Sequence, residues 1–186
     1  MKKIKEKLLF IDTETGGIIP SVHSLLSVAC VVWDNSKIVD TYNTFISIDN
    51  YVCTKEALEI NKIDLNEAKK NGLKEKDVIN NILRFISKNF SEGQRVNLAG
   101  HNVNFDINFL KQLFERNEFN FGDYFSYRVL DTASILKYLF YKGVVNEEIS
   151  SLDKAIGYFD ITIDNRHSAL SDATVTAKLF SKLLEL

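Results

Sequence analysis

The sequence contains few of the residues that form flexible linkers or covalent cross-links. Its 186 residues include one proline and eight glycines, too few for a long flexible linker. There are only two cysteines, Cys30 and Cys53, and their spacing matches no zinc or redox motif. These shortages exclude a disulfide-stabilised scaffold. They predict two free thiols in a reducing compartment, which we expect to be the cytoplasm.

Long apolar runs and a strong net charge are also missing. The apolar stretch at residues 8–11 stops at Asp12 and is too short for a signal peptide or a membrane span. The formal net charge is −2 and 45% of the residues are hydrophobic, as in ordinary globular proteins. We therefore expect no membrane partner. A nucleic-acid ligand would have to be bound locally, for example through metal ions, because no broad cationic surface is available.

The apolar pattern predicts strands first and then strands that alternate with helices. Three strands are expected at residues 8–11, 24–33 and 38–48, and their short connections predict an antiparallel meander. Further strands are expected at 96–100 and 128–131, and helices at 77–90, 106–116, 133–141 and 169–184. This order predicts an α/β fold in which a mixed β-sheet is flanked by helices, with residues 1–186 forming one domain.

Two carboxylates, Asp12 and Glu14, follow the first predicted strand. Side chains alternate along a strand, so this pair can point to the same side. Like charges repel when they are placed together, and a divalent cation is the natural compensation. Oxygen ligands favour Mg²⁺ or Mn²⁺ over zinc. Taken alone, however, the pair is better explained as two exposed residues of a loop.

Two further polar clusters, at residues 101–106 and 167–172, lie where predicted helices begin. Helix capping alone would explain Asn104 and Asp106, and the helix dipole would explain Asp172. His167 precedes the last helix, and an imidazole that titrates near neutral pH suits a general base. Taken together, four carboxylates and a histidine exceed what capping requires. Such a set suits two-metal hydrolysis of a phosphodiester.

The three clusters resemble the motifs of the DEDDh 3′→5′ exonucleases, the branch of the ribonuclease H-like superfamily that includes proofreading subunits and ribonuclease T. The matching motifs are Phe10-Ile11-Asp12-Thr13-Glu14-Thr15-Gly16-Gly17, His101-Asn102-Val103-Asn104-Phe105-Asp106 and His167-Ser168-Ala169-Leu170-Ser171-Asp172. Asp131-Thr132 and residues 60–63 match minor landmarks. Ser168 stands where the sister DEDDy group has tyrosine, which favours the histidine form. The resemblance runs from about residue 8 to residue 184 and implies a ribonuclease H-like fold.

The resemblance implies a role for each matching residue. The implied metal ligands are Asp12, Glu14, Asp106 and Asp172, which would hold two Mg²⁺ that Mn²⁺ could replace. Asp12 would be shared between the two ions, and His167 would be the general base that takes a proton from the attacking water. The implied substrate contacts are Thr13, Thr15, Gly16, Asn61, His101 and Asn102. For His101 and Asn102, local hydrogen bonds that position the Asp106 loop are an equal alternative.

These roles imply a 3′→5′ exonuclease that releases nucleoside 5′-monophosphates from a nucleic-acid 3′ end, with single-stranded or frayed DNA preferred to RNA. One alternative is an exoribonuclease that trims RNA. Another is a catalytically silent scaffold that binds nucleic acid or a polymerase, which the complete set of carboxylates and His167 opposes. A two-metal nuclease of the ribonuclease H or integrase type would not explain the spacing from His167 to Asp172. A DNA polymerase is a further implied partner, although the last predicted helix ends near Leu186 without a docking tail. The sequence carries no signal for an oligomeric state.

Aromatic residues are frequent between residues 119 and 127. The set consists of Phe119, Phe121, Tyr124, Phe125 and Tyr127. Exposed rings could stack on bases, whereas buried rings would be part of the core. We favour the core, and we also expect Trp33 to be structural.

Overall fold

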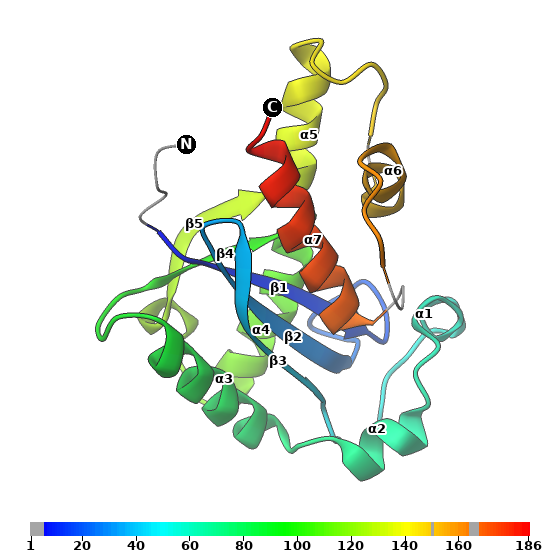
Figure 1. The fold of residues 1–186 in the computed structure, drawn as a ribbon. Helices are drawn as coiled ribbons and strands as arrows, with labels where there is room; N and C mark the ends of the chain where they lie inside the picture. The colour runs from blue at the N-terminus through cyan, green and yellow to red at the C-terminus, as the bar shows by residue number, and fades with distance from the viewer. Residues whose placement is uncertain (1–5, 150, 164–167) are drawn as a thin grey trace.

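The computed structural model describes residues 6–149, 151–163 and 168–186, and its centre is a five-stranded sheet with helices on both faces (Figure 1). The strands are β1 (Leu8–Thr15), β2 (Leu25–Asp34), β3 (Lys37–Phe45), β4 (Val96–Gly100) and β5 (Phe125–Asp131), in the order β3-β2-β1-β4-β5. The β1–β2 and β2–β3 pairs are antiparallel, whereas β1–β4 and β4–β5 are parallel. The predicted meander and mixed sheet are confirmed.

The helices are α1 (Lys55–Asn61), α2 (Leu65–Asn71), α3 (Glu75–Asn89), α4 (Asn104–Arg116), α5 (Thr132–Tyr141), α6 (Leu152–Tyr158) and α7 (Ala169–Leu183), with a 3-10 turn η1 at Phe121–Asp123. The apolar periodicity predicted α3, α4, α5 and α7 to within about two residues at each end. It did not predict α6 or η1, which are too short to show a helical period. Among the described residues, no helix combines the length and the apolar character needed to cross a membrane.

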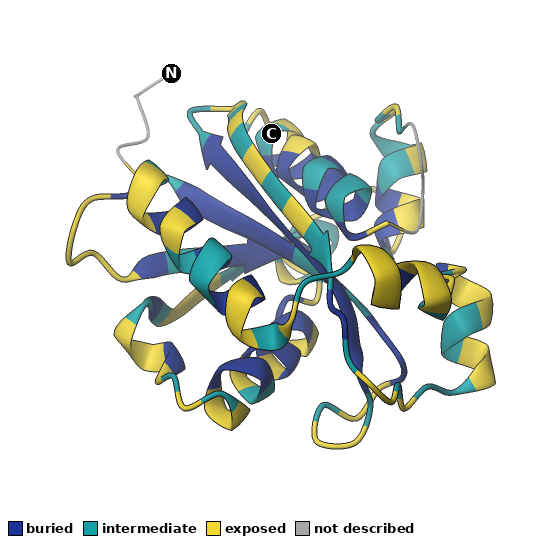
Figure 2. Cartoon of the chain, turned by 90° about the horizontal axis from the view of Figure 1, so that it is seen from below, coloured by how far each residue is buried: buried dark blue, intermediate teal, exposed yellow. Residues whose placement is uncertain are grey.

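The central strand is buried on both faces, which explains its uninterrupted apolar sequence. Leu9 and Ile11 belong to the core beneath α3 and α4, and Phe10 belongs to the core beneath α7. Figure 2 shows the central strands buried between helices whose outward turns are exposed, whereas the edge strand β3 alternates between intermediate and exposed residues. Three alanines of α7, at positions 169, 173 and 177, lie in its core cluster. Small side chains of this kind let a helix lie close to a sheet.

Trp33 is structural, as expected. Its side chain is fully buried at the end of β2, and its Nε1–H donates to Ser181 Oγ of α7 at 2.8 Å. Its ring also contacts Phe180, with 5.1 Å between the centroids. Trp33 therefore joins the sheet to the last helix at the end away from the carboxylates.

β1 is longer than its apolar run, so the predicted end of the strand was wrong. The strand continues through Asp12 and Glu14 to Thr15, and its register pairs Asp12 with Ala29 and Glu14 with Ser27 of β2. Backbone pairing with β2 does not require apolar side chains, which explains why hydrophobicity alone placed the end too early. As a result, both carboxylates lie on a hydrogen-bonded strand and not in a loop. The sheet fixes their position.

Candidate active site

Three of the predicted metal ligands converge between β1 and α7. Asp12 and Glu14 lie on the face of β1 that is covered by α7, and Asp172 lies in the first turn of that helix. One carboxylate oxygen from each residue lies within 4.8 Å of the other two. Ser168 Oγ caps α7 by accepting a hydrogen bond from Ser171 N at 3.3 Å, which fixes where the helix begins. The end of β1 and the start of α7 therefore form one acidic cluster.

The donor set of this cluster fits a divalent cation. Asp172 is buried and the two β1 carboxylates are half-buried. Three carboxylates at this spacing repel one another strongly unless a cation or protons compensate their charge. All the ligand atoms are oxygens, which suits Mg²⁺ or Mn²⁺. The arrangement can therefore hold a metal ion where it would contact a phosphate.

The fourth predicted ligand, Asp106, approaches β1 from α4. It lies in the first turn of that helix and is buried. Its Oδ1 accepts two hydrogen bonds from Thr13, one from the backbone N–H at 2.8 Å and one from the hydroxyl at 2.7 Å. Val103 occupies the N-cap position of α4, so neither Asn104 nor Asp106 is the N-cap residue, although the Asp106 carboxylate also accepts from its own backbone N–H. Through Thr13, Asp106 ties α4 to the middle of the carboxylate segment.

The environment of Asp106 changes its acidity. Burial raises the pKa of its carboxyl from 3.8 to about 7, and the charge of Asp131 acts in the same direction. The two hydrogen bonds from Thr13 favour the ionised form and oppose that rise. A cation next to Asp106 would favour ionisation further. The protonation of Asp106 is therefore coupled to whatever charge occupies the site.

We expect the metal-free protein to lose stability as the pH rises from about 4 to about 7. In this range the folded protein keeps the Asp106 proton that the unfolded chain has released, because the folded pKa is the higher one. The free energy of unfolding should fall by an amount on the order of a few kcal/mol. Urea denaturation in EDTA across this pH range would measure it.

The matched variants for this measurement are Asp106→Asn and Asp123→Asn, the second at an exposed position of η1. The first should flatten the dependence of unfolding free energy on pH, because it cannot ionise. The second should retain it. An Asp106→Asn protein with the wild-type slope would show that another group is responsible.

A cavity of about 480 Å³ adjoins Glu14, within the usual size range of small-molecule sites. Thr13, Glu14 and Thr15 of β1 line one side of it, and Ala57, Ile60 and Asn61 of α1 line the other. Ile18 and Phe105 also line it and are exposed. Phe105 was not predicted as a contact, although it directly precedes Asp106 in the second motif. The cavity has one carboxylate on each side, Glu14 of β1 and Glu56 of α1, together with several apolar side chains.

Three of the predicted substrate contacts help to build this cavity. Thr15 Oγ1 donates to Gly17 O at 2.7 Å, and Asn61 Nδ2 donates to Thr15 O at 3.1 Å. Asn61 Oδ1 also accepts from Ile63 N at 3.0 Å. The backbone N–H and the hydroxyl of Thr13 both donate to Asp106 Oδ1. The structure therefore places Thr13, Thr15 and Asn61 at the cavity, where the Asn61–Thr15 bond ties α1 to the end of β1 and Thr13 ties β1 to α4.

Gly16 makes the next turn of the chain possible. Its N–H donates to Ser24 O at 2.7 Å, and its carbonyl accepts from Thr54 N at 2.6 Å. A Cβ at this position would lie 2.4 Å from Val52 O. The amide of Gly16 is thus engaged within the fold, and only glycine lets residues 52–54 approach this closely.

His101 and Asn102 lie outside the residues that line the 480 Å³ cavity. His101 Nδ1 is 3.0 Å from Thr132 Oγ1, and this hydroxyl donates to Gly100 O at 3.1 Å. Asn102 has a left-handed backbone (φ 57°), and its N–H donates to Asp131 Oδ1 at 3.0 Å. These contacts join the loop before α4 to the junction of β5 and α5. Asp131 and Thr132, which the sequence marked only as minor landmarks, are their partners.

The remaining predictions for the site have different outcomes. His167 lies outside the described residues, so its role as general base stays a prediction. In the aromatic segment, Phe119, Phe121, Tyr124 and Phe125 all contact the buried ring of Phe114 and form part of the core. Tyr127 differs from them, with 82% of its side chain exposed.

Comparisons with known proteins agree with this geometry. Residues 9–180 match the RNase_T family, which is described as exonuclease. The chain is 30% identical over 185 residues to the 3′-5′ DNA exonuclease Cap18 of Escherichia coli, a match that covers 97% of this chain and 92% of that protein. It is 28% identical to ribonuclease T of Buchnera aphidicola, over 94% of this chain and 80% of that enzyme.

Larger proteins match this chain over part of their length. The chain is 26% identical to the PolC-type DNA polymerase III of Caldanaerobacter subterraneus, where the match covers 98% of this chain but 12% of the polymerase. Exonuclease I of Methylocaldum szegediense superposes with a TM-score of 0.83 at 20% identity, covering 97% of this chain and 40% of that one. The chain thus spans less than half the length of these two proteins.

Proposed function

The chain belongs to the RNase T family of exonucleases, and from this membership we propose that it shortens DNA from the 3′ end by metal-dependent hydrolysis and releases nucleoside 5′-monophosphates. One observation carries the chemical part of the proposal. Three carboxylates from β1 and α7 converge within 4.8 Å, beside a cavity that Glu14 itself lines. A phosphate that enters this cavity would meet the only acidic cluster of this kind among the described residues.

Each residue would have a distinct task. Asp12, Glu14 and Asp172 would hold two Mg²⁺ ions together with Asp106, and Mn²⁺ could replace them. When bound, such ions activate water and stabilise the charge on the scissile phosphate and on the leaving oxygen. His167 would accept the proton of the attacking water. Thr13, Thr15 and Asn61 keep the end of β1 in place, and the cavity between β1 and α1 would receive the terminal nucleotide.

The preference for DNA is supported by the relatives. The exonuclease of Escherichia coli that matches along nearly its whole length is named as acting on DNA. A structural neighbour, exonuclease I of E. coli, was solved with a dT13 oligonucleotide. The similarity to ribonuclease T favours RNA as the second candidate substrate. The similarity to PolC-type polymerases supports a DNA polymerase as the partner of this domain.

Hydrolysis of matched 5′-labelled single strands of DNA and RNA tests the proposal directly. We expect a descending ladder of products on DNA in the presence of Mg²⁺, no products in EDTA, and slower cleavage of RNA. Faster cleavage of RNA would replace DNA by RNA as the substrate. A purified, folded protein that cleaves neither strand would instead favour the scaffold alternative.

Two further assignments belong to this proposal. Residues 1–186 would act as one exonuclease domain, since the sheet, the acidic cluster and the cavity all come from this segment. The protein would work in the cytoplasm, where its two cysteines, which are free in the structure, would stay reduced.

A further inference from the structure

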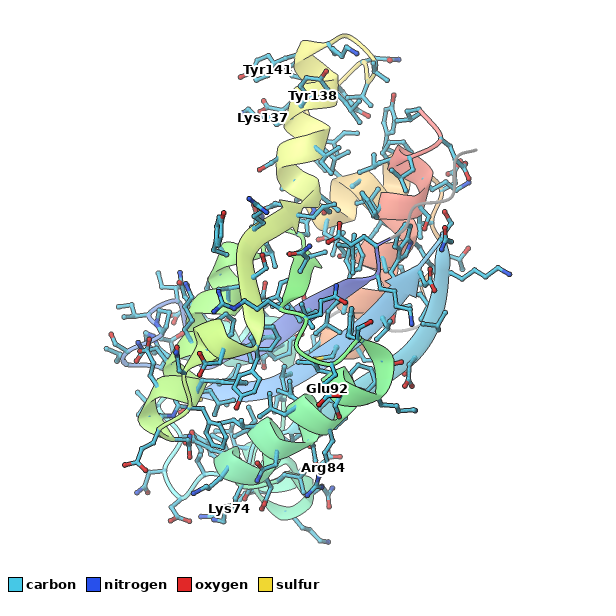
Figure 3. The ribbon with its side chains drawn as sticks, turned by 90° about the vertical axis from the view of Figure 1, so that its left-hand side faces the viewer. Lys74, Arg84, Glu92, Lys137, Tyr138 and Tyr141 are labelled. Atoms are coloured by element: carbon cyan, nitrogen blue, oxygen red, sulfur yellow. The ribbon has the colours of Figure 1, made fainter. Side chains whose placement is uncertain are left out.

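The exposed tyrosines of the described residues all lie on β5 and α5. Tyr127, Tyr138 and Tyr141 expose 82%, 58% and 75% of their surface, whereas the other tyrosines are at least partly buried. Tyr138 and Tyr141 project from the part of α5 farther from the sheet, next to Lys137 (Figure 3). Large exposed rings that lie together on one helix, as Tyr138 and Tyr141 do, commonly mark a binding surface.

Each of these rings lies next to a cationic side chain. Lys137 Nζ lies 5.8 Å from the ring centroid of Tyr141, and Lys142 Nζ lies 5.6 Å from that of Tyr138. On β5, the Arg128 guanidinium lies 5.2 Å from the Tyr127 ring. We call Lys137, Tyr138, Tyr141 and Lys142 the α5 face. Its rings and ammonium groups are presented together, in the combination that binds bases and phosphates.

The charge of the α5 face complements a polyanion. The helix itself contains no aspartate or glutamate, and its one charged residue is Lys137. The ammonium of Lys137 is 2.8 Å from Glu148, a residue of the following loop, so its charge is partly compensated. Lys142 follows at the C-cap. The α5 face thus presents two ammonium groups beside exposed rings, and that of Lys137 is shared with Glu148.

The α5 face is connected to the second motif of the active site. Asp131 Oδ1 accepts hydrogen bonds from Asn102 N and from Ala133 N, so the loop before α4 and the start of α5 share one carboxylate. A groove of about 350 Å³ is lined by Asn102, Ala133, Ser134, Lys137 and Ile149. It therefore runs from the second motif to the first cation of the α5 face. The helix is about 15 Å long, a reach of several nucleotides.

We propose that the α5 face binds the single-stranded nucleic acid upstream of the 3′ nucleotide that is being removed. Bases would stack on Tyr138 and Tyr141, and phosphates would contact Lys137 and Lys142. The inference rests on the proposed function, because it needs a 3′ end at the carboxylates. Two features favour a nucleic acid over a protein partner at this face. They are the lysine ammonium groups beside the two tyrosine rings and the groove that leads to the second motif.

The dependence of the rate on substrate length tests the inference. The substrates are 5′-labelled oligothymidylates of about 4 and about 20 nucleotides, a range that brackets common single-strand site sizes. The wild-type protein should have a higher kcat/KM on the longer strand. A Tyr138→Ala/Tyr141→Ala variant should lower the ratio of long to short kcat/KM by about tenfold or more. Both rings are exposed, and a thermal melt would check that the variant folds.

A matched pair of charge reversals separates the α5 face from general electrostatics. Lys142→Glu should lower the same ratio and weaken its dependence on salt. The control is Arg84→Glu, which makes the same change in charge on α3. Figure 3 shows Arg84 far from Tyr138 and Tyr141. This variant should leave the ratio of long to short kcat/KM near the wild-type value. Equal effects of the two reversals would overturn the inference.

The remaining outcomes distinguish this inference from the proposed function. A wild-type protein that cleaves both lengths equally well, or a tyrosine variant with the wild-type ratio, would overturn the inference alone. If the wild-type protein cleaves neither, the proposed function fails. The face is then tested by the fluorescence anisotropy of a labelled 20-nucleotide strand, where equal binding by the variant overturns the inference and loss of binding supports it. Altered self-association in sedimentation, with an unchanged length ratio, would assign the face to a protein contact.

Discussion

Replacement of Asp12 by alanine is expected to abolish DNA hydrolysis and to remove most of the affinity for Mn²⁺. The reason is the position of this carboxylate, which lies on the central strand within 4.8 Å of ligand atoms from Glu14 and Asp172. A ligand shared between two cations contributes to both binding sites, so its loss should slow turnover by about 10³-fold or more, or at least about 4 kcal/mol in the barrier. The product ladder and calorimetric titration with Mn²⁺ measure the two effects.

The same substitution should not unfold the metal-free protein. Removal of one of three neighbouring carboxylates relieves repulsion between like charges, so the melting temperature in EDTA should stay the same or rise. In Mn²⁺ the wild type should gain stability that the variant does not, because binding stabilises only the folded state. A suitable control is Asp49→Ala, which removes a surface aspartate whose carboxylate lies 3.6 Å from Lys74. Unchanged Mn²⁺ binding by Asp12→Ala would contradict the assignment of Asp12 as a shared ligand.

The carboxylate cluster could be predicted from the sequence because its signal is local. Asp12 and Glu14 are two residues apart on a strand, and alternation alone places them on one side. Asp172 required only that the last helix begin near residue 169, which its alanine-rich periodicity indicated. The element that orients Asp12 was misjudged, since the strand was expected to end at residue 11 and continues to Thr15. Pairing with β2 decides this boundary, and pairing is not visible in a single segment.

The contacts that join distant segments could not be predicted in the same way. Asp106 was read first as a helix cap, but its Oδ1 binds Thr13, which is 93 positions away in the chain. For His101 and Asn102 the sequence left substrate contact and local hydrogen bonds as equal alternatives, and it could not name the partners found in the structure, Thr132 and Asp131 at the neighbouring strand end. These partners are chosen by the parallel alignment of β4 with β5. The motif identifies the residues, but their hydrogen-bond partners depend on how the strands are aligned in the sheet.

The same distinction applies to the aromatic residues. Phe119, Phe121, Tyr124 and Phe125 surround Phe114, as a core explanation predicts, because the segment folds back against α4 through η1. The sequence did not predict a surface role for Tyr138 and Tyr141, because both lie in a helix with an apolar sequence. The turn of α5 that buries Leu136 leaves both of these rings exposed. Amino-acid composition alone cannot distinguish the buried aromatic residues from the exposed ones.

Substitution of His167 by alanine is expected to lower kcat by about 10³-fold while leaving the affinity for Mn²⁺ near the wild-type value. The residue directly precedes Ser168, the N-cap of α7, in a motif whose aspartate belongs to the acidic cluster. A general base contributes roughly 10²- to 10⁴-fold to a hydrolysis, and a neutral imidazole is needed to accept the proton. Single-turnover hydrolysis and Mn²⁺ calorimetry on the same protein measure the two quantities.

The pH profile shows whether the imidazole acts as the base or only supports the structure. In the wild type, the rate should rise with pH as the imidazole loses its proton, because only the deprotonated ring accepts a proton. The His167→Ala protein should lose this limb, and added imidazole should restore part of the rate, which a purely structural role would not allow. A variant that retains the wild-type rate and the wild-type pH limb would remove His167 from the mechanism. The proton would then have to pass to another group at the active site.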